Sequence, residues 1–369
     1  MSLKIGKRLK IARIYRGLTL SELGDKVGIS KQSLSLYEKN QGALDLEKIG
    51  ALAKELNFPS KFFIQDEDIV DENTIIYFRR KTTARETDIA KQKIKTDFLF
   101  KIYRYLVEYI EFPRLNIKKY DIESCPAPKY VADDIRRYWN LGNAPVGNLK
   151  HTLESNGIPV VLLTSDRKID AYSTKKDDYC MVILNEQQSE SRALFDMAHE
   201  LGHILMHPWQ ESTEKLSDEV FKLREEQADA FASAFLLPEE EIKKDFVNLN
   251  PYKLQTYRNL KRKWKVSIQA LIMRASDLGI IDNEIKTKLY KQISTYKWRL
   301  WEPDDVEFNI KNTLLKQGVE LLKEVYSNDF IMNDMAEKGF YVYPTEVESL
   351  LGLSPNTLAV KKSYLVNLR

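Results

Sequence analysis

The sequence predicts a mostly α-helical protein with a small β-sheet, an α+β fold. Two observations lead to this prediction. Apolar residues recur at helical spacing through most of the chain, and the period shortens to two residues over 159–185. A length of 369 residues favours two or three domains. We expect an all-α domain at 1–66, a linker and long helix at 67–128, a mixed domain at 129–285 and a mainly helical C-terminal region at 286–369.

The composition is ordinary for a globular protein, with 43% hydrophobic and 30% charged residues. No apolar run approaches the roughly 20 residues of a membrane span, and the basic N-terminus lacks the apolar core of a secretion signal. We therefore expect a cytoplasmic protein with no membrane partner. Cys125 and Cys180 lack the spacing of a disulfide framework or a cysteine zinc site, so each is expected to be a structural thiol.

The N-terminal domain is the basic part of the chain. Residues 1–65 contain 12 Lys and Arg against 6 Asp and Glu, a net charge of +6, whereas the remainder carries −3. This distribution indicates a polyanionic partner for the N-terminal domain alone.

Five short helices are expected in this domain. IGKRLKIARIYRG has apolar residues at helical spacing, and Gly17 can end that helix. Thr19 and Glu22 have capping-box spacing at the start of the second helix, which ends near Gly28. The remaining three helices have start signals at Ser30, Asp45 and Pro59.

The linker contains one candidate strand, TIIYF, and a long helix is predicted at 85–112. DIRRYWNL and VGNLKHTLESNGI predict two more helices, and Asn156-Gly157 is a left-handed signal that ends the second. PVVLLT, KIDAYS and YCMVILN read as short strands. Helices follow at 188–207 and 215–236, and 239–290 is helical.

The stretch FDMAHELGHILMHP contains the most specific chemical pattern in the sequence. His199 and His203 are four residues apart, so on a helix both imidazoles can face one metal ion. Glu200 lies on the neighbouring face, within reach of a metal-bound water. This HExxH arrangement suits Zn²⁺, which needs a third protein ligand as well. The competing interpretation is a buried helix with ordinary core histidines.

The second helix, LREEQADAFASAFLLP, offers the missing ligand and disfavours that alternative. Glu225 and Asp229 share one face, so Glu225 can complete the site while Asp229 accepts the far N–H of a ligand histidine. Glu226 is a rival ligand about 100° round the helix. His207 is expected to support the site or the fold, and His151 to be structural.

These residues predict metal-assisted hydrolysis of a peptide bond. Zinc would lower the pKa of a bound water towards about 7, and Glu200 would take its proton and pass it to the leaving amine. Tyr172 and His207 are alternative donors to the developing oxyanion. YCMVILN is either an exposed edge strand that holds an extended peptide or an internal core strand.

HELGHILMH followed by EEQADAFASAFLLP resembles the ImmA/IrrE metallopeptidases, and the resemblance covers roughly 130–285. It implies a thermolysin-like zincin fold and a family activity in which a helix-turn-helix repressor is cleaved. Gln227 departs from the family pattern, where an acidic residue is common, but the E-x-x-A spacing still favours Glu225 over Glu226. The resemblance implies His199, His203 and Glu225 as zinc ligands and Glu200 as the catalytic base.

TLSELGDKVGISKQSLSLYEKN resembles the helix-turn-helix of XRE-type, lambda-repressor-like domains, with Gly24 where two helices cross. The resemblance implies a recognition helix that opens at Ser30 and enters the major groove of double-stranded operator DNA. A helix-turn-helix used only for protein contacts is the alternative, which the basic charge disfavours. DNA contacts are expected from Lys31, Gln32, Ser33, Ser35 and Asn40, with Arg13, Arg16 or Lys39 as further phosphate contacts.

Two functions fit these patterns. The first is a DNA-binding transcriptional regulator whose zinc peptidase cleaves a protein or peptide, either itself or a partner repressor. The second is a transcription factor or antitoxin, with a toxin as partner, whose peptidase-like domain binds metal or ligand as a sensor without turnover. The intact site residues favour the first. We expect a homodimer, because one recognition helix reads too few base pairs for useful specificity.

Overall fold

The computed structural model has the predicted α+β fold, with many helices and one small mixed sheet. Its contacts divide the chain into two compact units. Unit 1 contains residues 1–74, 82–112 and 312–369, and unit 2 contains 75–81 and 113–311. The residues that the structure describes are 5–65, 74–78, 86–120, 127–163, 171–186, 188–209, 216–308 and 312–360.

The N-terminal helices of unit 1 begin and end where the sequence predicts. Thr19 and Glu22 form the capping box, in which Glu22 N donates to Thr19 Oγ1 at 3.2 Å and Thr19 N donates to Glu22 Oε2 at 2.7 Å. The side chains of Ser30 and Asp45 also cap their helices. The five helices are α1 (Gly6–Tyr15), α2 (Leu20–Val27), α3 (Lys31–Glu38), α4 (Leu46–Leu56) and α5 (Ser60–Phe63).

Two glycines fix the turn between α2 and α3. Gly28 ends α2 with a φ of 67°, a left-handed conformation that glycine adopts without steric cost. Gly24 lies where the chain after the turn comes back to α2, and a Cβ there would be 2.5 Å from the Ile29 carbonyl oxygen. The helix-turn-helix geometry therefore depends on a close backbone approach that only glycine permits.

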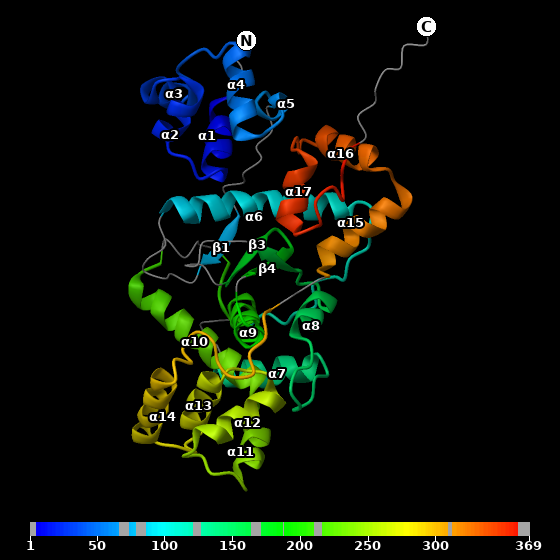
Figure 1. Cartoon of the computed structure of the whole chain (residues 1–369). Helices are drawn as coiled ribbons and strands as arrows, with labels where there is room; N and C mark the ends of the chain where they lie inside the picture. The colour runs from blue at the N-terminus through cyan, green and yellow to red at the C-terminus, as the bar shows by residue number, and fades with distance from the viewer. Residues whose placement is uncertain are drawn as a thin grey trace. The chain divides into compact units, whose positions relative to one another are not determined.

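The helices after residue 312, which lie in the region predicted at 286–369, belong to unit 1. Tyr15 on α1 stacks on Phe98 at 5.0 Å between ring centroids, and Phe98 meets Phe340 edge-on at 5.4 Å. Residues 286–311 instead belong to unit 2. Figure 1 shows the orange and red helices beside the cyan helix α6; these are α6 (Glu86–Val107), α15 (Leu314–Val325), α16 (Asn328–Glu337) and α17 (Pro344–Leu351).

Unit 2 contains a four-stranded sheet in the order β1-β3-β4-β2. β3 is antiparallel to both β1 and β4, and β2 is parallel to β4. β4 is therefore internal, so of the two alternatives left open for this strand the structure shows the internal one. Its continuous apolar run from Cys180 to Leu184 is buried, as expected for a strand covered on both faces. The strands are β1 (Ile75–Phe78), β2 (Val160–Leu163), β3 (Ala171–Lys176) and β4 (Tyr179–Asn185).

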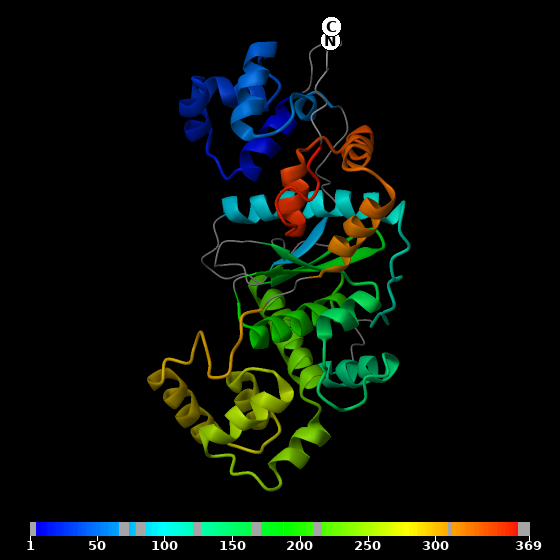
Figure 2. The ribbon, with the colours of Figure 1, turned by 45° about the vertical axis from the view of Figure 1, so that its right-hand side comes forward.

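The helices of unit 2 cover this sheet and extend away from it. Figure 2 shows α9 below the sheet, where it packs on β3 and β4, with α10 packed on α9. No described helix combines the length and the apolar character that a membrane span requires. The helices are α7 (Pro128–Tyr138), α8 (Leu149–Ser155), α9 (Glu190–Met206), α10 (Asp218–Leu236), α11 (Glu239–Phe246), α12 (Leu254–Trp264), α13 (Ile268–Asp277) and α14 (Asn283–Thr295).

A glycine brings α9 and α10 close together. A Cβ at Gly202 would lie 3.0 Å from the Phe231 ring and 3.3 Å from Ala228 Cα. Phe231 and Ala228 are fully buried. This close approach brings the polar face of α10 to the histidines of α9.

Cys180 is a buried free thiol, and burial raises its pKa to about 12. Such a thiol is inert at neutral pH, in agreement with a structural role. Cys125 lies outside the described residues.

Candidate metal centre and nucleic-acid interface

Three metal-ligating side chains converge between α9 and α10. His199 Nε2 and His203 Nε2 are 3.0 Å apart. Glu225 Oε1 lies 3.2 Å from His203 Nε2, and Glu225 Oε2 lies 3.6 Å from His199 Nε2. One ligand atom from each of the three residues lies within 4.8 Å of the other two. The structure thus brings together the three residues that the sequence predicted as ligands.

The far nitrogen of each histidine has a partner. His199 Nδ1 lies 2.8 Å from Asp229 Oδ1, and His203 Nδ1 lies 2.7 Å from His207 Nδ1. His207 Nε2 is 3.1 Å from Gln227 Oε1. Because an amide oxygen only accepts, His207 donates from Nε2 and accepts the His203 proton at Nδ1. His199 likewise donates from Nδ1 to Asp229. The Nε2 atoms of His199 and His203 therefore present lone pairs to the centre, and Gln227 orients His203 through His207.

Burial keeps these imidazoles neutral. His203 and His207 are almost fully buried. Desolvation lowers the pKa of His203 to about 4 and that of His207 to about 2. Zinc binds the neutral imidazole, so burial favours the protonation state that a metal ligand needs.

The donor set fits zinc. Two imidazole nitrogens and one carboxylate oxygen are the ligands of a catalytic zinc site, which leaves a position open for water or substrate. Glu225 has 17% of its side chain exposed, against 1% for His199, so the centre is closed on the histidine side and accessible beside the carboxylate. Glu226, the rival ligand, has 64% of its side chain exposed and lies 3.8 Å from Lys222, directed to solvent.

Glu200 is a buried carboxylate on the same helix. Ser173 Oγ on β3 donates to Glu200 Oε2 at 2.6 Å. Burial raises the pKa of Glu200 to about 7, while the hydrogen bond from Ser173 acts in the opposite direction. A carboxylate with this pKa can exchange protons near neutral pH, as a general base must.

Neither residue suggested for the oxyanion is placed for that role. Tyr172 precedes Ser173 on β3, and successive residues of a strand face opposite sides of the sheet. Since Ser173 faces Glu200, Tyr172 is directed away from it. His207 has both ring nitrogens within hydrogen-bond distance of protein atoms. His151, expected to be structural, is exposed on α8 and lies 3.4 Å from Ser155 Oγ.

Tyr77 on β1 is a neighbour of the metal centre that sequence reasoning missed. Its ring stacks on the His203 ring, with centroids 5.4 Å apart, and meets Trp209 edge-on at 4.8 Å. Its hydroxyl donates to the Pro208 carbonyl oxygen and accepts from Arg224 Nη1 at 2.8 Å. No local pattern connects Tyr77 with residues more than a hundred positions away, so only the tertiary structure reveals the contact.

The recognition helix α3 presents its first residues to solvent. Lys31 and Gln32 are exposed, and Ser33 and Ser35 are half-buried. Ser33 Oγ lies 2.9 Å from Ser30 Oγ. Asn40 accepts from Gly6 N at 2.8 Å through Oδ1.

Both arginines suggested as phosphate contacts pair with groups inside unit 1. Arg13 pairs with Glu38, with Nε and Oε1 2.6 Å apart. Arg16 donates to the Leu56 carbonyl oxygen at 2.6 Å and pairs with Glu346 at 2.8 Å. Lys39 is exposed. The arginines therefore stabilise the N-terminal helices, and Lys39 is the better placed of the three for a phosphate.

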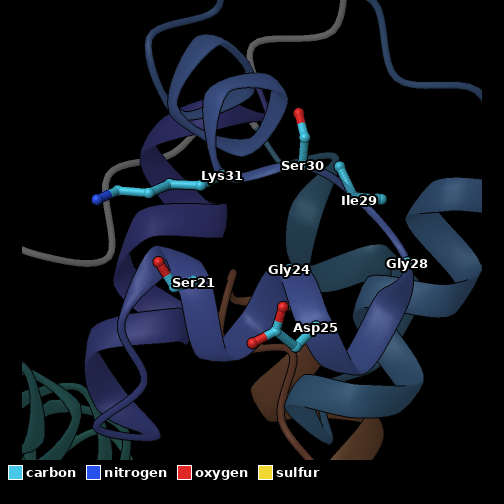
Figure 3. Close-up of a pocket in the computed structure, with 7 residues that line it drawn as sticks. All are labelled: Ser21, Gly24, Asp25, Gly28, Ile29, Ser30 and Lys31. Carbon is cyan, nitrogen blue, oxygen red and sulfur yellow. The ribbon is translucent and has the colours of Figure 1, made fainter.

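A surface pocket of about 320 Å³ lies at the turn between α2 and α3. Ser21 and Asp25 come from α2, and Ser30 and Lys31 come from the start of α3 (Figure 3). The pocket adjoins the residues predicted to contact DNA, and Asp25 adds a carboxylate that repels phosphate. We therefore regard the pocket as the hollow between the two helices of the motif and not as a separate anion site.

These geometries define two classes of domain in one chain: a helix-turn-helix, and an α+β domain in which a helix with the HExxH pattern packs against an acidic helix. Comparison with known families agrees. Residues 9–63 match the helix-turn-helix family, and residues 153–276 match the family of IrrE N-terminal-like domains, a peptidase family. Both resemblances found in the sequence are thereby confirmed.

Two curated relatives match a short part of the chain. An uncharacterized HTH-type transcriptional regulator of Sinorhizobium medicae is 27% identical over 66 residues, which are 18% of this chain and 48% of that protein. An uncharacterized HTH-type transcriptional regulator of Rhizobium meliloti has the same identity and coverage. The chain spans about half the length of the curated relatives it matches.

Proposed function

We propose that this protein is a DNA-binding transcriptional regulator with a zinc-dependent metallopeptidase domain. In this proposal the domain hydrolyses a peptide bond in the protein itself or in a partner repressor. The observation that carries the proposal is the convergence of His199 Nε2, His203 Nε2 and Glu225 within 4.8 Å, next to the buried carboxylate of Glu200.

His199, His203 and Glu225 would hold the zinc ion. Asp229 and His207 would act through the ligand histidines, because each lies within hydrogen-bond distance of the Nδ1 atom that faces away from the centre. A zinc ion held there would polarise the scissile carbonyl and acidify water.

Glu200 would be the general base. Its carboxylate takes a proton from the attacking water and delivers it to the nitrogen of the leaving amine. The Ser173 hydrogen bond at 2.6 Å fixes the orientation of the carboxylate. Burial raises the pKa of Glu200 above that of a solvated carboxylate, which makes it a stronger base for this transfer.

The peptidase proposal is tested with the full-length protein and Glu200→Gln, each loaded with zinc. We expect wild-type protein to cleave itself or the repressor encoded beside its gene, and Glu200→Gln to bind zinc without cleaving. Peptide products would be identified by mass spectrometry. Equal zinc binding by both proteins with no cleavage that depends on Glu200 would contradict the peptidase proposal and favour a metal-binding sensor.

The DNA proposal rests on the exposed start of α3 in a domain with a net charge of +6. Lys31 and Gln32 would read base edges, while Ser33, Ser35, Asn40 and Lys39 would position the helix on the backbone. Because two recognition helices read two half-sites, we propose a homodimer on a palindromic operator. Binding to the protein's own promoter, with stoichiometry from sedimentation, tests this; one protomer per site would contradict the dimer.

A further inference from the structure

The edge of β3 beside the metal centre is occupied by a segment of the same chain. Ser173 on β3 donates to Glu200, so β3 is the strand next to the proposed base. The next strand position lies about 4.8 Å further out. β1 fills it, antiparallel to β3, with Tyr77 directly opposite Ser173.

Tyr77 attaches β1 to the metal centre. Residues opposite each other in a sheet point to the same face, so Tyr77 is directed at α9 as Ser173 is. The Tyr77 side chain is 2% exposed, and its ring stacks on the ligand His203. Arg224, which directly precedes Glu225, donates to the phenolic oxygen at 2.8 Å. β1 thus contacts one predicted metal ligand and a neighbour of another.

The environment of Tyr77 selects for a phenol. The flat face of His203 and the edge of Trp209 accommodate an aromatic ring. At the far end, Arg224 supplies a donor and the Pro208 carbonyl supplies an acceptor, and one hydroxyl group satisfies both. A phenylalanine would leave both groups without this partner, and an aliphatic side chain would also lose the ring contacts.

Extended peptides that bind by strand addition obtain affinity from main-chain hydrogen bonds and specificity from alternate side-chain pockets. We propose that β1 occupies in cis the strand position that an extended peptide substrate takes in trans. The substrate then carries a tyrosine in the place of Tyr77, and β1 must leave before another chain is cleaved. This inference rests on the peptidase function proposed above, and it assigns that site both a substrate class and an internal inhibitor.

The short length of β1 allows a peptide to displace it from β3. The strand is only four residues long, from Ile75 to Phe78, and such a short strand has few main-chain hydrogen bonds. A competing peptide binds only those molecules in which β1 has left the site. Its apparent Kd is therefore its intrinsic Kd divided by the fraction of open molecules. Loosening β1 should therefore increase peptide affinity, whereas a merely structural β1 would give no such increase.

The experiment uses the full-length protein with Glu200→Gln and zinc, so that binding is measured without cleavage. The probe is a fluorescein-labelled peptide, ENTIIYFRRK, which copies residues 72–81. We expect Tyr77→Ala on this background to bind the probe at least about tenfold more tightly than the parent, by fluorescence anisotropy. The same peptide with its tyrosine replaced by alanine should bind Tyr77→Ala at least about tenfold more weakly.

A matched pair of conservative variants controls for the case in which Tyr77→Ala fails to fold. Tyr77→Phe removes a hydroxyl that donates to a prolyl carbonyl at the β1 position. Tyr257→Phe, on α12, removes a hydroxyl that donates to the Pro251 carbonyl oxygen at 2.8 Å; Pro251 lies in the loop before this helix. We expect Tyr77→Phe to increase probe affinity and Tyr257→Phe to leave it unchanged.

Hydrogen exchange provides the second measurement. Those amides of β3 that donate to β1 and not to β4 should exchange faster in Tyr77→Phe than in the parent, and a saturating probe should restore their protection. The proposal is overturned if the probe fails to bind, or if parent, Tyr77→Phe and Tyr257→Phe bind it equally. These outcomes do not depend on catalysis. A protein that cleaves nothing would contradict the peptidase proposal, while the binding measurements would still decide whether β1 occupies a peptide-binding position.

Discussion

The candidate metal centre of unit 2 and the predicted recognition helix of unit 1 are built in opposite ways. His199, His203 and Glu200 are buried, and each has polar partners within the protein. Lys31 and Gln32 on α3 are exposed to solvent. A preorganised site fails when one member is removed, because its neighbours are left unpaired. A set of exposed side chains loses contacts one at a time. The predictions below test this difference.

The largest effect is expected at the metal ligands. His203→Ala removes one of three donors and also leaves His207 without its partner, so we expect zinc affinity to fall by more than about a hundredfold. Zinc should increase the thermal stability of the wild type and have no effect on the variant. The measurements are calorimetric titration and thermal unfolding with and without zinc. A zinc-dependent increase in the melting temperature of His203→Ala would exclude His203 as a ligand.

An intermediate effect is expected one step from the metal. Asp229→Ala removes the carboxylate that orients His199, and loss of such a partner typically weakens metal affinity by about 10–100-fold. Glu226→Ala is the matched control, since Glu226 is an acidic residue on the same helix with 64% of its side chain exposed. If the two variants bind zinc with equal affinity, Asp229 does not orient the ligand.

The same difference explains what the sequence could predict. HExxH and the acidic pair on α10 are local patterns with helical spacing, so sequence alone predicts His199, His203, Glu225 and Asp229 as members of one site. The caps of α2, α3 and α4 are equally local. Tyr77 was missed, because its contact with His203 joins segments that no periodicity relates. The sequence does not decide whether β4 is an edge or an internal strand, since strand order depends on which segments pair, and here the distant segment β1 pairs with β3.

A smaller, graded effect is expected on α3. Gln32→Ala should cost about 1–3 kcal/mol of operator affinity and relax the preference at one base pair, since a bidentate glutamine contact discriminates by that amount. Lys39→Ala should instead weaken binding to all sequences and reduce the salt dependence. Lys54→Ala, an exposed lysine on α4, is the control. Binding curves on operator and scrambled DNA at several salt concentrations separate these effects. Identical losses on both DNAs for Gln32→Ala would rule out base reading.

The smallest effect is expected at the N-terminal cap of α2, where a substitution should lower the stability of that helix alone. Thr19→Ala removes the oxygen that accepts from Glu22 N at 3.2 Å, a loss that typically costs about 1 kcal/mol. Amides of α2 should therefore exchange about fivefold faster in the full-length protein, while those of α9 are unchanged. Thr19→Ser keeps the hydroxyl and should exchange as the wild type does. Faster exchange in α9 would mean that the two units unfold together. The contrast between a buried, cooperative centre and exposed side chains that act one at a time would then have to be abandoned.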